Sequence, residues 1–342
     1  MTSLSTTEGV HETPSHLFRW QLVGKKRRLI GAPNKPMKEA QEFFLAQLKP
    51  LAPRFHSSTA KEYGLGAVRN ARAHHGNRFI FTLDFADAFD HVDGDRLAEM
   101  ITRAYNKRYP WDAQPERNKE YVWKQSLWRQ VLFRFCLTEK GGLIQGSTLS
   151  PFLFDWYCEE LVDRPIRHYL YEAARVYYGY QPYVYTRFVD NLVISGNERI
   201  YRSTRAAIRR IIAKAGFAEN FGKTVFIDPF KKKGRTAMVT GIRVSETHFG
   251  LPRKKVKETE RMIVRALETP LFGEKPSVIK GHALYLLDVL RGKPKLNALE
   301  ARALRQYVAW CDKNNENSSW AKKTLEKKAP PTLPKKKRSK KP

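Results

Sequence analysis

Two aspartates that lie far apart in the chain, Asp84 and Asp190, are the residues whose placement most favours chemistry. Asp84 ends an alternating run over residues 78–83, and Asp190 lies between two runs of β-branched and aromatic residues, 183–189 and 192–195. If these strands are neighbours in one sheet, the carboxylates meet and repel each other unless divalent cations hold them. Two cations held in this way activate the attacking oxygen and stabilise the leaving oxygen of an in-line phosphoryl transfer. We therefore expect a two-metal site for phosphoryl transfer.

The pair Asp190-Asn191 is predicted to form the tight turn of a β-hairpin, because Asp and Asn tolerate the positive φ that such turns need. A carboxylate at the tip of a hairpin is rigidly held and free to bind a cation. Surface turns also use these two residue types without any chemistry. The pair alone therefore leaves open a surface turn or half of a metal site, and Asp84 favours the second.

Two further segments supply groups that a phosphorylated substrate needs. A glycine-rich loop over residues 141–151 opens a helix, for which Ser150 is the expected N-cap. A hairpin predicted over residues 19–30 carries a run of cations. Other helices are predicted over residues 35–48 and 204–215 and after the N-cap Asp93.

The composition favours a polyanionic partner. The chain has 342 residues with 63 Lys+Arg against 34 Asp+Glu, and its net charge of +29 is spread over the whole length. A protein tolerates such self-repulsion best when it binds a polyanion, and nucleic acid fits better than an acidic membrane because no basic amphipathic helix stands out. No apolar run approaches the ~20 residues that span a bilayer, so we expect no membrane partner.

The cysteines and the N-terminus favour a cytoplasmic protein. Cys136, Cys158 and Cys311 are far apart and odd in number, so they predict neither a disulfide framework nor a zinc site. The first residues lack the basic start and the apolar run of a secretory signal. Both features fit a reducing compartment.

Several motifs, taken in order along the chain, resemble those of the reverse transcriptase family and, within it, of retron-type members. Their order and spacing from about residue 20 to residue 290 carry the resemblance more than any single motif does. The matching segments are residues 27–33 in the fingers, 83–89 and 143–151 in the palm, 188–191 at the catalytic turn, and 216–224 after it. The resemblance implies an α+β right-hand polymerase with fingers, a palm of antiparallel sheet packed on helices, and a small helical thumb.

The resemblance also implies roles at the metal site. Asp84, the carbonyl of Phe85 and Asp190 become ligands of two Mg²⁺ ions, with Mn²⁺ as the alternative metal. Phe85 also contacts the nucleotide, and Asn191 belongs to the catalytic turn. Lys223 becomes the proton donor to the leaving pyrophosphate, and a merely solvated lysine is the alternative interpretation.

Five other residues are implied to bind the nucleotide. Arg27 and Arg28 grip the triphosphate, and Gln145 and Gly146 line the pocket. Phe89 becomes the gate that collides with a ribose 2′-OH and thereby selects deoxynucleotides.

Two motifs are similar to retron signatures. Asn70 and His74 fit an asparagine-alanine-two residues-histidine pattern, and Val239, Thr240 and Gly241 fit a valine-threonine-glycine pattern associated with recognition of the cognate RNA. The alternatives are an ordinary surface histidine and a simple tight turn, within a segment that otherwise indicates one short strand. The implied partners are a noncoding RNA as template and primer, dNTPs, the DNA product, and an effector or second polymerase protein.

The catalytic motifs depart from the family pattern at four positions. Asn191 replaces the second aspartate, Phe188 replaces a tyrosine, Ile144 replaces a proline, and Asp155 stands where asparagine is common. An amide offers an oxygen but no charge, so metal binding is expected to weaken or the metal preference to move.

Three functions are consistent with these observations. The first is an RNA-directed DNA polymerase that copies a cognate structured noncoding RNA, primed from a 2′-OH of that RNA, in antiphage defence. The second is a defence-associated reverse transcriptase that makes repetitive or untemplated DNA with a partner polymerase. The third is a catalytically weak RNA-binding scaffold.

The expected domain boundaries follow the motifs. We predict a disordered N-terminus (1–16), fingers (17–80 and 91–140), palm (81–90 and 141–238), thumb (239–320) and a disordered basic tail (321–342).

Overall fold

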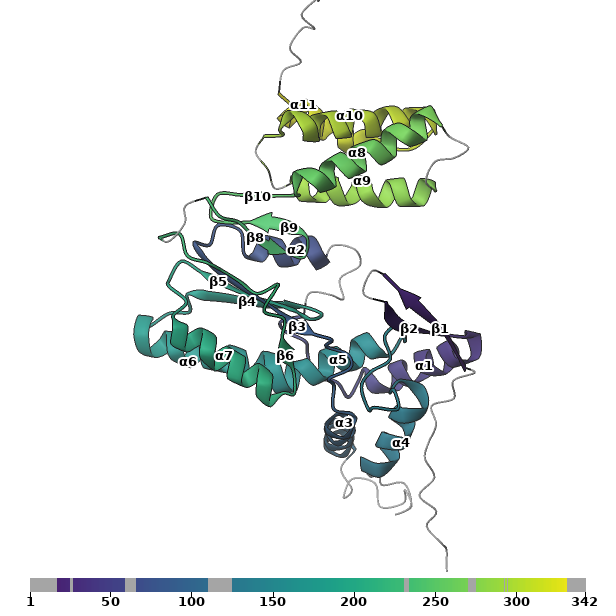
Figure 1. The fold of residues 1–342 in the computed structure, drawn as a ribbon, viewed down its shortest axis with the longest axis vertical. Coiled ribbons are helices and arrows are strands. Elements are labelled where there is room, and N and C mark those ends of the chain that lie inside the picture. Colours follow the sequence, from purple (N-terminus) through teal and green to yellow (C-terminus); the bar gives the residue numbers. More distant parts are fainter. Residues whose placement is uncertain are drawn as a thin grey trace, which may run out of the picture. The chain divides into compact units, whose positions relative to one another are not determined.

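The computed structural model describes residues 17–24, 27–58, 66–109, 125–230, 234–269, 275–291, 293 and 295–330. The predicted disordered N-terminus, and the predicted tail from residue 331 onward, lie outside the described residues. The chain divides into two compact units (Figure 1). Unit 1 comprises residues 1–60 and 81–225, and unit 2 comprises residues 61–80 and 226–342.

The sheet of unit 1 brings together the strands that carry the two aspartates. Its order is β4 (Tyr183–Phe188), β5 (Asn191–Gly196), β3 (Phe79–Ala86) and β6 (Ala218–Glu219), with β7 (Val225–Ile227) also paired to β3. β4 and β5 are antiparallel in one unbroken register from Tyr183↔Gly196 to Phe188↔Asn191. β5 and β3 are hydrogen-bonded neighbours, so the predicted adjacency of the Asp84 strand and the Asp190 hairpin is confirmed.

Helices cover this sheet and the segments beside it. They are α1 (Lys35–Leu48), α3 (Gly94–Arg108), α4 (Gln125–Phe135), α5 (Ser150–Cys158), a π-helix (Glu159–Asp163), α6 (Arg164–Tyr178) and α7 (Arg202–Lys214). Figure 1 shows α6 and α7 side by side below the sheet, and α6 contacts β4 while α7 contacts β6. The core between the layers is aromatic, because Phe85 of β3 stacks on Phe217 at 4.5 Å and Tyr157 of α5 donates a hydrogen bond to the Ala215 carbonyl over 2.9 Å.

Most predicted helices of unit 1 are confirmed at their expected positions. α1 spans residues 35–48 as predicted, and the Asp93 side chain caps α3 by accepting from the N–H groups of Asp95 and Arg96. The prediction that Ser150 is an N-cap is wrong, since Ser150 is the first residue of α5 and Leu149 is the N-cap. Leu149 has helical φ and ψ, and no side chain makes a capping hydrogen bond at the start of this helix.

The basic hairpin is also confirmed. β1 (Phe18–Val23) pairs antiparallel with β2 (Arg28–Pro33) in unit 1. The backbone N–H of Gly31 donates to the Gln145 carbonyl oxygen over 2.8 Å. The hairpin is thereby joined to the glycine-rich loop.

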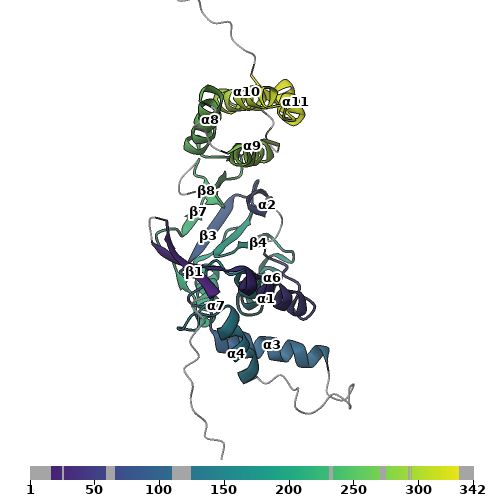
Figure 2. The ribbon, with the colours of Figure 1, turned by 90° about the vertical axis from the view of Figure 1, so that its right-hand side faces the viewer.

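Unit 2 combines a small sheet with α2 (Gly66–Ala73) and a set of helices. The sheet order is β10 (Phe249–Gly250), β9 (Ile242–Val244) and β8 (Ala237–Val239). The helices are α8 (Arg253–Glu268), α9 (Pro276–Arg291), α10 (Ala298–Lys313) and α11 (Ser319–Lys328), which Figure 2 shows as a bundle. α10 contacts α8, α9 and α11, and Leu286, Leu304 and Trp310 are buried in the bundle.

The two compact units group two segments differently from the predicted domains, and one predicted strand is two strands. Residues 66–80 were expected in the fingers, but α2 contacts β8 and β9 within unit 2. Residues 226–238 were expected in the palm and also belong to unit 2. The predicted single strand over residues 239–244 is two strands, because Thr240 (φ +47°) and Gly241 (φ +84°) form a left-handed turn that folds β9 back onto β8.

The predicted disordered tail begins too early, because residues 321–328 belong to α11. Ala321 and Thr324 are buried and Leu325 is half-buried, at the spacing of one helix face. Lys322, Lys323 and Lys327 are exposed, so the charge run masked a short amphipathic helix.

Across the part of the chain that the structure describes, no helix combines the length and the apolar character needed to cross a membrane.

Candidate active site

Asp84 lies in β3, Asp190 lies in the turn of the neighbouring β4–β5 hairpin, and the two segments are tied through the backbone. The N–H of Phe85 donates to the Asp190 carbonyl oxygen over 3.0 Å. Asp84 is buried, with 3% of its surface exposed. Burial raises the pKa of the Asp190 carboxyl above its ordinary value, and the negative charge of Asp84 raises it further, while Lys223 and Arg28 act in the opposite direction. The Asp84 carboxylate is thus close enough to oppose the ionisation of Asp190.

The hairpin turn differs in register from the prediction. Its two turn residues are Val189 and Asp190, and Asn191 is the first residue of β5, paired with Phe188. The positive φ falls on Val189, at +54°, and on neither polar residue. The Asn191 amide nitrogen donates to Asp190 Oδ1 over 2.7 Å, so the residue that replaces the second aspartate faces the first one as a donor.

Asp84 has two polar partners from the segment after β6. Lys223 Nζ lies 2.7 Å from Oδ1 and 3.0 Å from Oδ2 of Asp84, and Asn220 Nδ2 donates to Oδ1 over 3.2 Å. The Asn220 backbone N–H also donates to the Asp84 carbonyl oxygen over 2.8 Å. Lys223 is therefore the counterion of Asp84, although 49% of its side chain is exposed.

A cavity of about 220 Å³ in unit 1 is lined in part by Asp190. Its lining residues are Arg28, Asp87, Ala88, Phe89, Gln145, Phe188, Val189, Asp190 and Asn191. Three of the residues predicted to bind nucleotide, Arg28, Phe89 and Gln145, line this cavity. Arg27 lies at the exposed turn of the hairpin with φ +47°, and the Phe85 ring is buried against Phe217.

Gly146 shapes the cavity through its backbone. It has φ +99°, and a Cβ at this position would lie 2.6 Å from Ile30 Cγ2 and 3.0 Å from the Gly31 carbonyl oxygen. Only glycine lets the loop approach the β1–β2 hairpin this closely. The loop and the hairpin thereby place Gln145 and Arg28 on the same cavity.

The donor set fits a divalent cation that keeps part of its shell for substrate. Among the described residues, no group of three or more His, Cys, Asp and Glu side chains is arranged to hold a metal ion. Two carboxylates are present, and Lys223 already supplies a positive charge at one of them. Mg²⁺ is commonly bound through one or two carboxylates together with waters and substrate phosphates. Asp84 and Asp190 therefore suit Mg²⁺ better than a metal that needs a closed protein cage.

The five residues predicted for RNA recognition belong to unit 2, where they meet each other. Thr240 Oγ1 donates to the Ala67 carbonyl oxygen of α2 over 2.6 Å, and α2 carries Asn70 and leads to His74. Asn70 and His74 are wholly buried and Val239 is nearly so. The alternative of an ordinary surface histidine is therefore wrong. The two signatures are therefore parts of one packed structure within unit 2.

Burial makes His74 a determinant of acid stability. Desolvation lowers the pKa of His74 to about 3, so the folded protein keeps this side chain neutral where an unfolded chain binds a proton. Stability from this residue is complete above pH 6.5 and is lost progressively as the pH falls from 6.5 towards about 3. We expect His74→Gln to flatten this part of the curve of unfolding free energy against pH, measured by denaturant titration. His75→Gln, at the exposed neighbour, is the control, and parallel curves for wild type and His74→Gln would contradict the expectation.

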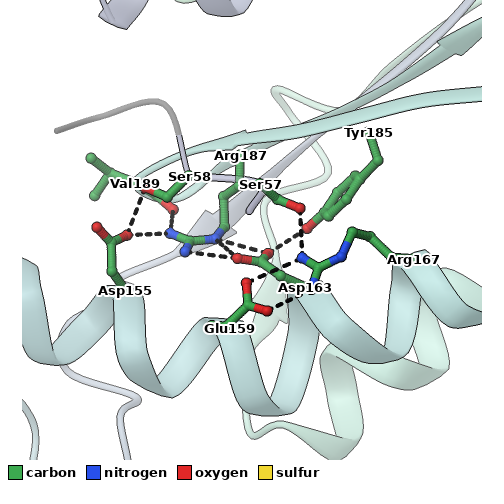
Figure 3. Close-up of polar contacts among 9 residues, drawn as sticks. All are labelled: Ser57, Ser58, Asp155, Glu159, Asp163, Arg167, Tyr185, Arg187 and Val189. Atoms are coloured by element: carbon green, nitrogen blue, oxygen red, sulfur yellow. Dashed lines mark hydrogen bonds and ion pairs between the residues drawn. The ribbon is translucent and has the colours of Figure 1, made fainter. Parts of the chain in front are cut away.

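Sequence reasoning missed a buried charge network behind the catalytic turn. Arg187 of β4 binds Asp155 and Asp163, and Arg167 binds Glu159 (Figure 3). Two signals in the sequence indicate this network. Asp155, Glu159 and Asp163 recur every four residues in a largely apolar helical segment, and a single arginine interrupts the strand that leads into the turn.

The fold and the site define a palm-type polymerase: a carboxylate on a central strand faces another at the turn of the neighbouring hairpin, with a counterion lysine and a cavity lined from a glycine-rich loop and a basic hairpin. The sequence matches the family "Reverse transcriptase (RNA-dependent DNA polymerase)" over residues 21–244, and the chain belongs to this family. Retron Mx65 reverse transcriptase of Myxococcus xanthus is 29% identical to it over 287 residues, which are 81% of this chain. The match covers 60% of that relative, so the chain spans less than two thirds of its length.

Among solved structures, apo telomerase from Candida tropicalis has a TM-score of 0.52 at 13% identity, covering 96% of this chain and 61% of that chain. At this identity the likeness concerns the fold alone. The predicted right-hand polymerase fold and the resemblance to a retron-type reverse transcriptase are confirmed.

Proposed function

We propose that the chain is an RNA-directed DNA polymerase that copies a structured noncoding RNA by two-metal nucleotidyl transfer. The observation that carries the proposal is the pairing of Asp84 and Asp190 beside the cavity lined by Arg28, Phe89 and Gln145. Two Mg²⁺ ions held by the carboxylates, with the Phe85 carbonyl as a further ligand, would activate the attacking hydroxyl and stabilise the leaving pyrophosphate.

The chain's own residues divide the remaining work. Arg28 supplies a fixed positive charge for the triphosphate of a dNTP, because a guanidinium binds phosphate through several N–H groups at once. Phe89 is held by stacking on Phe154, with ring centres 4.9 Å apart, so it forms a rigid wall against a ribose 2′-OH. Lys223 pairs with Asp84, and in the proposed reaction it donates a proton to the leaving pyrophosphate.

The retron resemblance supports the biological part of the proposal. We propose that template and primer are one noncoding RNA, that the DNA product stays linked to it, and that the reaction serves antiphage defence with an effector protein. Cys136, Cys158 and Cys311 are free thiols, which suits the reducing cytoplasm.

Sequencing the nucleic acid that copurifies with the protein tests the proposal. The protein is expressed with its flanking DNA, as wild type and as Asp84→Asn. RNA-linked DNA of one defined sequence that disappears in Asp84→Asn is the expected result. Simple repeats would instead favour untemplated synthesis with a partner polymerase, and RNA without DNA, identical in both proteins, would favour an RNA-binding scaffold.

The two hairpin arginines are expected to differ in their effect on nucleotide binding. Arg28 lines the cavity, whereas Arg27 lies at the exposed turn outside its lining. Losing one charge-assisted contact to phosphate costs roughly 1.5–3 kcal/mol, so Arg28→Ala should raise the KM for dNTP by about tenfold or more. Arg27→Ala should raise it less than about threefold. Steady-state primer extension measures both constants, and a larger effect at Arg27 would reverse the assignment.

A further inference from the structure

The turn that carries Asp190 is strained at the residue before it. Val189 has φ +54°, a left-handed conformation in which the side chain of a β-branched residue is crowded. Such positions persist only where neighbouring contacts over-determine them. At Val189 this contact is a hydrogen bond in which Arg187 Nη1 donates to the Val189 carbonyl oxygen over 2.9 Å.

The guanidinium of Arg187 is itself fixed from several directions. Its side chain is wholly buried, and Nε and Nη2 donate to the two carboxylate oxygens of Asp163 over 2.9–3.0 Å. Nη1 also donates to Asp155 Oδ1 over 3.0 Å, and the backbone N–H donates to the Ser57 carbonyl oxygen over 2.8 Å. The planar guanidinium is held along its Nε–Nη2 edge by Asp163 and at Nη1 by Asp155, so it has one orientation. The hydrogen bond to the Val189 carbonyl therefore has a rigid donor.

The acceptors come from one face of a helical segment (Figure 3). Asp155, Glu159 and Asp163 follow each other at four-residue spacing along α5 and the π-helix. Tyr185 donates to Asp163 Oδ1 over 2.6 Å, and Ser58 donates to Asp155 Oδ1 over 3.0 Å. The carboxylates around Arg187 are therefore satisfied by further donors, which offsets the cost of burying their charge.

Arg187 also contacts the wall of the cavity. Its guanidinium carbon lies 5.5 Å from the centre of the Phe154 ring, and Phe154 stacks on Phe89. One buried side chain therefore touches the backbone before Asp190 and the support of the predicted gate.

We propose that Arg187, anchored by Asp155 and Asp163, is a positioning residue that holds Val189 in its left-handed conformation and thereby aims the Asp190 carboxylate at the metal. Its consequence for DNA synthesis rests on the proposed polymerase function. A network that served only stability would leave the metal affinity of a folded variant unchanged, whereas a positioning role makes that affinity depend on Arg187.

Mn²⁺ binding, followed by electron paramagnetic resonance on the full chain, tests this role independently of DNA synthesis. The bound fraction that Asp190→Ala removes defines the site. Lysine at position 187 keeps the charge but cannot reach both carboxylates and the Val189 carbonyl, so Arg187→Lys is expected to weaken Mn²⁺ binding at this site about tenfold. Glycine adopts φ +54° without a side-chain penalty. Adding Val189→Gly to Arg187→Lys should therefore restore the affinity to within about threefold of wild type.

Arg167→Lys is the matched control, because Arg167 belongs to the same network but its hydrogen bonds go to Glu159 and Ser57, away from the turn. It should lower the melting temperature without changing Mn²⁺ affinity. Wild-type affinity in folded Arg187→Lys, or no recovery in the double variant, would overturn the proposal. If Arg187→Lys does not fold, Asp155→Ala removes one anchor of Nη1 and should weaken Mn²⁺ binding in the same direction, with Val189→Gly restoring it.

The same samples separate this inference from the proposed function. If wild type binds Mn²⁺ through Asp190 but makes no DNA, the proposed polymerase function is rejected. The Mn²⁺ affinities of the Arg187 and Val189 variants then still decide the positioning role. Absence of Asp190-dependent binding in wild type would reject the positioning role whatever the activity.

Discussion

Replacing Asp190 by alanine is expected to reduce DNA synthesis by about 10³-fold or more, because it removes one of the two carboxylates proposed to hold the catalytic cations. Asp190 reaches the site on a hairpin whose backbone is bonded to Phe85, so alanine leaves the fold in place while removing the ligand. Extension of a DNA primer on an RNA template, in Mg²⁺ and separately in Mn²⁺, measures the loss. Equal DNA yield from wild type and Asp190→Ala would reject the site.

Asn191→Asp is the matched comparison at the adjacent position. Asn191 donates its amide to Asp190 Oδ1, so aspartate there exchanges a hydrogen-bond donor for a second negative charge. In the absence of metal this charge opposes that of Asp190, and bound cations relieve the repulsion. We expect Asn191→Asp to retain or raise synthesis. A loss as deep as that of Asp190→Ala would mean that the amide itself is required.

The parts of the site that the sequence predicted share one property: each depends on local pattern and order along the chain. The sequence predicted Asp84 on a strand and Asp190 in a hairpin, although β3 continues past Asp84 to Ala86. Gly146 is visible as part of a glycine-rich loop before a helix. Once strands 78–86 and 183–196 are taken as neighbours, their carboxylates must approach each other, and the structure confirms that adjacency.

The features that the sequence did not yield depend on long-range packing or on a single torsion angle. The turn was expected at Asp190-Asn191 because polar residues tolerate positive φ, yet Val189 takes it. Local propensity favours the polar residues, but the Arg187 bond to the Val189 carbonyl overrides it. The residues next to Val189 in the sequence do not reveal that Asp155 and Asp163 anchor Arg187. The pattern around the turn could therefore not predict the register of the hairpin.

The grouping of the chain into two compact units was not predictable from the sequence for a related reason. α2 carries no signal that assigns it to a unit, and its place with β8 and β9 depends on contacts such as Thr240 Oγ1 to the Ala67 carbonyl oxygen. In the tail, the lysine run hid Ala321, Thr324 and Leu325, whose helical spacing is as regular as that of α1. The charge of a segment indicates how well it is solvated. The spacing of its apolar residues indicates whether it can form a helix that packs on the rest of the protein.

Gly146→Ala is expected to lower kcat/KM for dNTP incorporation by about 100-fold. The new Cβ would meet Ile30 Cγ2 at 2.6 Å and the Gly31 carbonyl oxygen at 3.0 Å, and the φ of +99° is itself unfavourable for alanine. Overpacking costs typically about 1–3 kcal/mol and the positive φ adds to it, so the loop and the hairpin must separate. That separation moves Gln145 and Arg28 apart and opens the cavity that they share.

Gly141→Ala isolates the contribution of backbone strain, because Gly141 has φ +87° but nothing lies within 4 Å of its added Cβ. It should reduce the free energy of unfolding by about 1 kcal/mol and leave kcat/KM unchanged. Steady-state kinetics and denaturant unfolding of both variants separate the two effects. If Gly146→Ala lost only stability, as Gly141→Ala is expected to do, the close approach of loop and hairpin would not shape the nucleotide pocket. A loss of kcat/KM confined to Gly146→Ala would instead show that the close contact of loop and hairpin brings Gln145 and Arg28 together in one nucleotide-binding surface.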